Sequence, residues 1–264
     1  MTDKKDLHEQ YLDKLDYLIR AAKKAGADAS DGIIYSGQSE SVSWRLGKLE
    51  DVERSESADL GLRVFMGKRQ AIVSSSDISN GVLDQLVERA IDMAKNAPED
   101  PYAGLADPDL LALTASDIPE LDLYDDTKKS ANELKSLART IEEVALGVDG
   151  ITNSEGASAS SSNGLIATAN SNGFAQSYRS SNFSLSISVI AGADTTMERD
   201  YAYSSKRHFA DLRDPDSIGR EAADKTLRRL GPRKVKTCKV PIIFDPRVSR
   251  TLLGHLAGAI NGQG

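Results

Sequence analysis

The sequence predicts an α+β protein built from two successive units, each running helix, antiparallel β-meander, helix. Apolar residues recur at helical intervals in three separate stretches of the chain, and Pro215 is predicted to open a fourth helix. Between these stretches lie short runs that alternate or are rich in β-formers, as antiparallel strands are. Helices and antiparallel strands that are segregated in this way are typical of α+β folds rather than of doubly wound parallel sheets. The repeated order of elements therefore predicts a structural duplication.

The first predicted helix runs from Lys5 to Ala25, where apolar side chains recur every three or four residues. Gly26 follows it and is a typical helix stop. The predicted strands of the first meander come next, at Ile33–Tyr35, Val42–Leu46, Leu60–Val64 and Ala71–Val73.

A second helix is predicted from the apolar face of Val82–Ala94, and Pro98 ends it. The segment Pro98–Asp126 combines four prolines with acidic residues, so we interpret it as a long surface connection between the two units. The predicted first domain, with this linker, is residues 1–126.

The second unit repeats the order, with a helix predicted at Lys129–Leu146 and a hairpin at Gly164–Arg179. The pair Asn172-Gly173 tolerates positive φ and predicts the turn of that hairpin. Another helix is predicted to begin at Pro215, and Lys239–Phe244 is predicted to be a buried strand. The second domain is thus predicted at residues 127–238, and 239–264 as the start of a C-terminal β-rich domain.

Composition excludes some classes of partner. The 40 acidic and 33 basic residues give a formal charge of -7, the wrong sign for binding a phosphate backbone. Cys238 is the only cysteine, so nothing requires an oxidising compartment. No stretch approaches the roughly 20 apolar residues of a membrane span, and the N-terminus lacks a secretory signal. We therefore expect a cytoplasmic protein that contacts neither nucleic acid nor membrane.

Motifs for chemistry are scarce. The chain has no H-E-x-x-H, and its histidines, His8, His208 and His255, lie far apart, so metal binding within it is not expected. The acidic run Glu50–Glu53 suits a solvated turn or edge, although a catalytic carboxylate cluster is the alternative. Gly156–Gly164 is predicted to be a flexible loop, with a nucleophilic serine as the alternative. The hydroxyl-rich strands beside it, through Ser180–Asn182, suit a sheet that faces water or peptide.

Two segments carry a family resemblance, VPIIFDPRVSRTLLGHLAGAINGQG at residues 240–264 and ESADLGLRVFMGKRQAIVSSSD at residues 56–77. They resemble the corresponding segments of PmbA/TldE proteins, in the TldD/PmbA family of metalloproteases. In the TldD branch the place after Leu252-Leu253 carries H-E-x-x-x-H, the source of two zinc ligands and a catalytic glutamate. The resemblance puts Gly254 and Ala259 where the histidines stand, His255 where the glutamate stands, and Gly258 at the motif's glycine. The resemblance therefore implies that this chain has no catalytic residue and no metal ligand. It also implies that these four positions contact the substrate or the partner.

The resemblance also implies a heterodimer in which a TldD-like partner holds the zinc and this chain helps to enclose unfolded peptides for proteolysis. The family name modulator of DNA gyrase fits an indirect, proteolytic role better than direct contact with DNA, because the chain is acidic. Family members continue past Gly264 into a further β-rich domain, so the chain is interpreted as a truncated form. Two alternatives stay open: a stand-alone peptide-binding or scaffold module, and an independent hydrolase with an unrecognised Ser or Asp centre.

Overall fold

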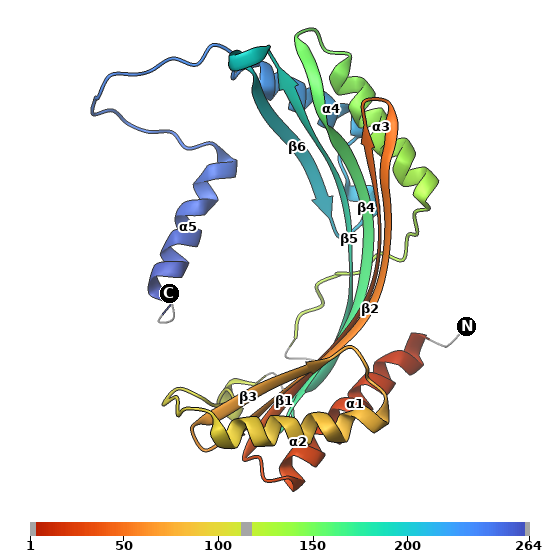
Figure 1. Cartoon of the computed structure of the whole chain (residues 1–264), viewed down its shortest axis with the longest axis vertical. Coiled ribbons are helices and arrows are strands. Elements are labelled where there is room, and N and C mark those ends of the chain that lie inside the picture. The colour runs from red at the N-terminus through yellow and green to blue at the C-terminus, as the bar shows by residue number, and fades with distance from the viewer. Residues whose placement is uncertain (1–3, 112–117, 262–264) are drawn as a thin grey trace. The chain divides into compact units, whose positions relative to one another are not determined.

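A computed structural model describes residues 4–111 and 118–261 of the chain, which folds as two compact units, Met1–Leu230 and Gly231–Gly264. The first unit contains two repeats of helix, three strands and helix (Figure 1). The elements of the first repeat are α1 (Lys4–Lys24), β1 (Ala29–Arg45), β2 (Lys48–Met66), β3 (Arg69–Ser75) and α2 (Asn80–Asn96). Those of the second are α3 (Ala131–Leu146), β4 (Ile151–Asn170), β5 (Ala175–Ala191), β6 (Glu198–Lys206) and α4 (Pro215–Leu227).

The six strands form one antiparallel sheet in the order β3-β2-β1-β4-β5-β6. The first strand of each repeat pairs with the other at the centre, from Asp31↔Asn170 to Trp44↔Ala157, and the later strands follow outward in the same order. The α+β class and the predicted duplication are therefore confirmed. The domain boundaries at 126 and 238 stay predictions; the two repeats share one sheet, and the compact units divide after Leu230.

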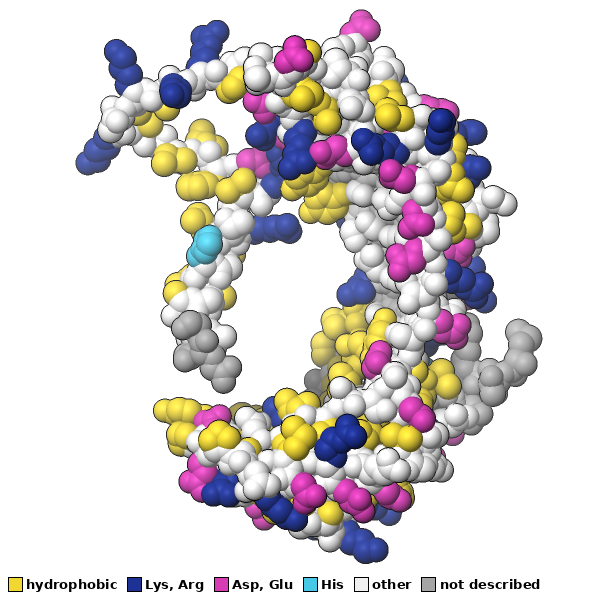
Figure 2. Space-filling view, in the orientation of Figure 1, with side chains coloured by type: hydrophobic (Ala, Val, Ile, Leu, Met, Phe, Trp, Pro, Cys, Tyr) yellow, Lys and Arg dark blue, Asp and Glu magenta, His cyan; other side chains and the backbone are white. Residues whose placement is uncertain are grey.

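All four helices of this unit cover the same face of the curved sheet (Figure 1). Because side chains alternate along a strand, Ile34, Val42 and Trp44 of β1 point to one face. Ile34 belongs to a core under α1 and α2, whereas Val42 and Trp44 belong to a second core under α3 and α4. The opposite face carries hydroxyl groups along its middle, and this area is mostly white in Figure 2. Its residues include Ser39, Ser41, Ser158, Ser160, Ser162, Ser184 and Ser186.

The two long hairpins are stabilised in different ways. The β1–β2 turn consists of Leu46 and Gly47, both with positive φ, as a two-residue type I′ turn requires. The buried carboxylate of Glu142 on α3 accepts hydrogen bonds from both of their N–H groups, at 2.9 and 3.0 Å. In the β4–β5 turn, the side-chain oxygen of Asn170 accepts from the N–H groups of Asn172 and Phe174. The predicted hairpin at 164–179 is thus confirmed, with Gly173 at φ +96.

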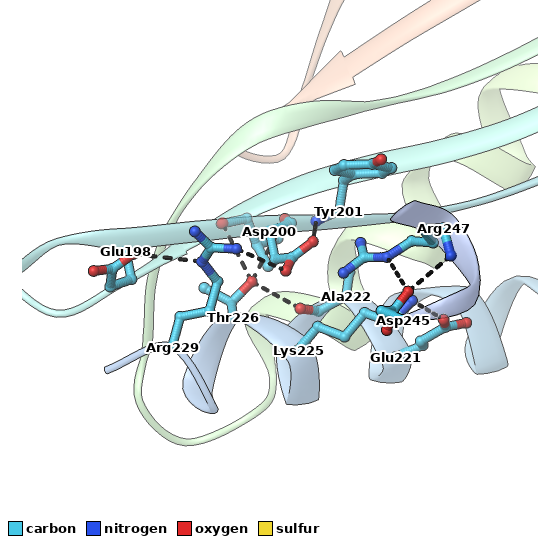
Figure 3. Close-up of polar contacts among 11 residues, drawn as sticks. Glu198, Asp200, Tyr201, Glu221, Ala222, Lys225, Thr226, Arg229, Asp245 and Arg247 are labelled. Carbon is cyan, nitrogen blue, oxygen red and sulfur yellow. Dashed lines mark hydrogen bonds and ion pairs between the residues drawn. The ribbon is translucent and has the colours of Figure 1, made fainter. Parts of the chain in front are cut away.

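Polar contacts fix α4 against β6 (Figure 3). The buried hydroxyl of Thr226 donates to the carbonyl of Ala222 at 2.8 Å, so this polar side chain is satisfied within its own helix. Just after the helix, the Arg229 guanidinium lies 3.5 Å from the carboxylates of Glu198 and Asp200. These contacts hold the end of the second repeat on the sheet.

Two sequence predictions are wrong. Gly156–Gly164 is part of strand β4 rather than a flexible loop, because Ala157 and Ala159 pack beneath α3 and α4 while the alternating serines, such as Ser158, face the other side. Lys239–Phe244 is neither a strand nor buried, since Ile242 and Ile243 are 73% and 97% exposed and no strand of the described residues pairs with them. A lone apolar segment cannot satisfy its backbone as a strand without a neighbour.

The remaining parts are simpler. The acidic run Glu50–Glu53 lies exposed on β2 and agrees with the solvated edge that the sequence predicted. In its described residues, the connection after α2 includes the short 3-10 turn Pro108–Leu110. The only regular element of the second unit's described residues is α5 (Pro246–Ile260). Within residues 4–111 and 118–261, no helix has both the length and the apolar character to span a bilayer.

Candidate functional site

The four residues that the sequence singles out all lie on α5. Asp245 caps this helix by accepting a hydrogen bond from the N–H of Arg247 at 2.8 Å, and Pro246 occupies its first turn. Gly254 and Gly258 are four residues apart and share one face of the helix, and His255 and Ala259 share the next. All four are exposed, and a Cβ at either glycine would meet no neighbour within 4 Å. Helix α5 therefore presents them together, but with only one side chain that has a donor atom.

The side chains of α5 do not provide enough donor atoms to bind zinc. Zinc sites in hydrolases need three protein ligands from histidine, cysteine or carboxylate side chains. Glycine and alanine offer none, which leaves the imidazole of His255 alone at the positions of the family motif. Across the described parts of the chain, no three His, Cys, Asp or Glu side chains gather closely enough to hold a metal ion.

A cavity of about 490 Å³ lies in the first unit, on the helix-bearing face, where the two helix pairs leave the middle of the sheet uncovered. Its walls are the first turns of α1, the midpoints of β1, β2 and β4, and the connecting segment Tyr124–Lys128. Charged groups of both signs line it, among them Glu56, Lys128 and Arg179. This cavity is a candidate site that no sequence motif indicated.

His8 projects from α1 into this cavity. Its Nδ1 lies 2.8 Å from the hydroxyl oxygen of Ser177 on β5. Burial and then the charge of Arg179 lower the pKa of His8, so the imidazole is neutral at pH 7. Within the described residues no carboxylate contacts His8, so the pair lacks the third group that orients the base in a hydrolase triad. We interpret the contact as one that docks α1 on β5.

The connecting segment before α3 is pinned to the second repeat. The backbone N–H of Asp125 donates to the hydroxyl of Ser181 at 2.8 Å, and its carboxylate accepts from the N–H groups of Thr127 and Phe209. The hydrogen bonds from Thr127, followed by the one from Phe209, lower the pKa of Asp125. A hydrogen bond to the carbonyl of Asp122 raises the pKa of His208. The segment therefore forms a fixed wall beside the sheet.

A second cavity, of about 790 Å³, lies between this wall and β5. The segment Ile118–Tyr124 forms one side, and Gln176–Ser180 of β5, with Ile166 and Arg207, forms the other. Tyr124 and Arg179 line both cavities, and the Arg179 guanidinium stacks 3.5 Å from the centre of the Tyr124 ring. We call the two cavities together the β5 groove.

Comparison with known proteins gives the family context. A model of the PmbA/TldA metallopeptidase domain 1 matches residues 31–94, and a model of the central domain of these metallopeptidases matches residues 124–230. The metalloprotease PmbA of Escherichia coli O157:H7 is 43% identical over 223 residues, covering 84% of this chain and 49% of that protein. A PmbA homologue of Haemophilus influenzae is 40% identical over 248 residues, covering 93% of this chain and 54% of that protein.

Solved structures agree with this. A Bacteroides thetaiotaomicron protein that carries the name modulator of DNA gyrase superposes on the whole chain with a TM-score of 0.86 at 25% identity, over 59% of its own length. TldE from Thermococcus kodakarensis shares the fold with a TM-score of 0.61 at 18% identity, over 81% of this chain and 47% of that one. The chain spans about half the length of the curated relatives that it matches.

Proposed function

The chain belongs to the PmbA/TldD family of metallopeptidases, and we propose that it acts there as a non-catalytic, substrate-holding subunit. In this proposal a TldD-like partner supplies the zinc and the cleavage chemistry of a cytoplasmic heterodimer. This chain contributes surface that holds unfolded peptide. The family membership supports a role in peptide hydrolysis. The chemistry of the chain's own residues supports a role in which this subunit holds the substrate and the partner cleaves it.

The observation that carries the proposal is the side-chain content of α5. A metallopeptidase needs imidazole or carboxylate ligands for zinc and a carboxylate that accepts a proton from zinc-bound water. At the corresponding positions this chain has Gly254, His255 and Ala259. A single exposed imidazole can neither complete a zinc site nor replace a carboxylate base. No catalytic step is therefore assigned to this chain.

The β5 groove supports the substrate-holding part of the proposal. It is built from connector, helix and strand residues of the first unit alone, and it offers polar, aromatic and apolar side chains together. Clefts of this size and mixed character are the usual places for ligands on protein surfaces. The same observation favours a second candidate function, a stand-alone peptide-binding module, because the groove is complete without α5.

The test is reconstitution with a TldD-like zinc subunit, using an unfolded, fluorescence-quenched polypeptide as the probe. We expect no cleavage from this chain alone and a rise in cleavage by the zinc subunit when the chain is added, with zinc recovered only in the partner. Cleavage by the purified chain would contradict the proposal. Capture of the polypeptide with no gain in cleavage and no association with the zinc subunit would favour the stand-alone module.

A further inference from the structure

Strand β5 is longer than the strand that pairs with its outer edge. It runs over Ala175–Ala191, but β6 pairs only with Phe183–Ala191. At Ser181 the connecting segment takes over, because the N–H of Ser181 donates to the carbonyl of Leu123 at 3.0 Å. The carbonyl of Ser181 in turn accepts from the Arg207 guanidinium at 3.1 Å. Among the described residues, no strand lies beside the stretch before Ser181 on this side.

That stretch leaves main-chain hydrogen-bonding groups open. Backbone N–H and C=O groups of alternate residues point to the same side of a strand, so Ser177 and Arg179 point outward as Ser181 does. Over residues 4–111 and 118–261, their outward groups have no hydrogen-bond partner. Unpaired donors and acceptors in this alternating order are complementary to the backbone of another extended chain.

The second cavity of the β5 groove lies along this stretch. Gln176, Tyr178 and Ser180 line it from the helix-free face of the sheet, together with Ile166, the cross-strand partner of Tyr178. The facing wall carries Ile118, Leu121 and Leu123. Side chains of an added strand would alternate between the two faces of the sheet, so apolar residues at every second position would meet these groups.

The first repeat provides a comparison within the same sheet, because its open strand edge is protected from pairing by charged side chains. Strand β3 pairs only with Leu60–Met66, so the outer edge of β2 is open over Lys48–Asp59. That edge carries five acidic side chains, at Glu50, Asp51, Glu53, Glu56 and Asp59, and two basic ones, at Lys48 and Arg54. Clustered charge on an edge strand discourages pairing with another chain. The open stretch of β5, Ala175–Ser180, carries one charge, on Arg179.

We propose that the open stretch of β5 binds an extended polypeptide as an added strand, between β5 and the segment Ile118–Tyr124, with apolar side chains preferred at alternate positions. The inference rests on the proposed function in one respect, because it names the place where this subunit would hold its substrate. The main-chain groups of Ser177 and Arg179 form the new ladder, so recognition depends little on the sequence of the polypeptide.

The first experiment uses the unmodified 264-residue chain. Its probe is a fluorescein-labelled peptide of alternating valine and threonine with a lysine at each end. Binding is followed by fluorescence anisotropy, and backbone amide exchange is compared with and without the peptide. We expect exchange to slow at Ser177 and Arg179 and to stay unchanged at Arg54 and Glu56, the outward positions on the β2 edge. Failure to bind, or slowing confined to other strands, would overturn the inference.

The second experiment removes one outward N–H. Proline is tolerated at an edge position whose N–H points away from the sheet, so Ser177→Pro is expected to fold and to bind the peptide about tenfold more weakly. Ser177→Ala keeps the N–H and removes only the hydroxyl that contacts His8, and it should bind like the unmodified chain. Arg54→Pro places the same ring at an outward position of the β2 edge that lines neither cavity, and it should also bind normally. Equal binding by Ser177→Pro and Ser177→Ala would contradict the proposal.

Cleavage assays separate this inference from the proposed function. If the unmodified chain enhances cleavage by the zinc subunit and Ser177→Pro enhances it equally, the β5 site is wrong and the proposed function stands. If the peptide protects Ser177 and Arg179 but no mixture gains activity, the site stands and the subunit role fails.

Discussion

In the first repeat, β3 leaves the outer edge of β2 open over Lys48–Asp59. In the second repeat, β6 begins to pair only at Phe183, and the outer edge of β5 is open before Ser181. The two equivalent edges differ in chemistry. The open edge of β2 carries many charged side chains, whereas the open edge of β5 faces a connecting segment across a cavity. The hairpins differ in the same way. A distant helix supplies Glu142 to the β1–β2 turn, whereas the β4–β5 turn uses its own Asn170. The two repeats therefore share one sheet but differ in the side chains at their edges and turns.

The largest effect is expected from breaking the first hairpin through α3. Glu142→Ala removes the acceptor of the N–H groups of Leu46 and Gly47, in a place where Glu142 itself is 1% exposed. We expect a loss of about 3 kcal/mol in the free energy of unfolding, because hydrogen bonds to a buried charged group contribute roughly 1.5–3 kcal/mol each. Urea unfolding followed by circular dichroism measures it.

The neighbouring residue provides the control. The side chain of Glu143 is 65% exposed and pairs with Arg139 on the surface of α3. Glu143→Ala should change the free energy of unfolding by less than about 0.5 kcal/mol. Equal losses in the two variants would show that α3 does not stabilise the hairpin through its buried carboxylate.

The second hairpin should respond less, since its turn is held locally and lies partly in solvent. Asn170→Ala removes the acceptor of two backbone N–H groups and is expected to cost about 1.5 kcal/mol. Asn170→Asp keeps an oxygen at that position and should restore most of the stability in the same urea titration. A larger loss than that of Glu142→Ala would reverse the comparison between the two hairpins.

Local features of this fold were predictable from the sequence because they depend on neighbouring residues. Helical periodicity predicts α1 to α3, Pro215 predicts the start of α4, and Asn172-Gly173 predicts the second turn. The serine-rich stretch of β4 was missed because glycine, serine and alanine have weak strand preference, and only packing beneath the helices fixes them. The contact of Glu142 with Leu46 spans 96 residues and leaves no local pattern.

The candidate site was even less accessible to sequence reasoning. The positions on α5 follow from family resemblance and not from a local sequence pattern. The β5 groove depends on where β6 ends and on where the connecting segment packs, which are both tertiary outcomes. The one local signal was the proline-rich segment Pro98–Asp126, whose length exceeds that of an ordinary loop and is typical of a functional connection.

Neutralising the charged edge should make the two repeats more alike. Glu53→Gln with Glu56→Gln removes two carboxylates from β2 and keeps the size of each side chain. We expect edge-to-edge self-association to strengthen about tenfold, or ~1.4 kcal/mol, by sedimentation equilibrium. Glu88→Gln with Asp92→Asn makes the same change in charge on α2, where both residues are exposed, and should leave association unchanged. The same gain in both double variants would point to net charge rather than to the edge.

The smallest effect concerns the equivalent helices that close the repeats. Asp214 caps α4 by accepting a hydrogen bond from the N–H of Ser217, whereas Ser79, at the same place before α2, makes no capping bond with its side chain. Asp214→Ala is expected to cost about 1 kcal/mol of unfolding free energy and Ser79→Ala only about 0.3 kcal/mol. Equal costs from urea titration would mean that the N–H groups of α2 gain a cap in solution, and that the two repeats end in the same way.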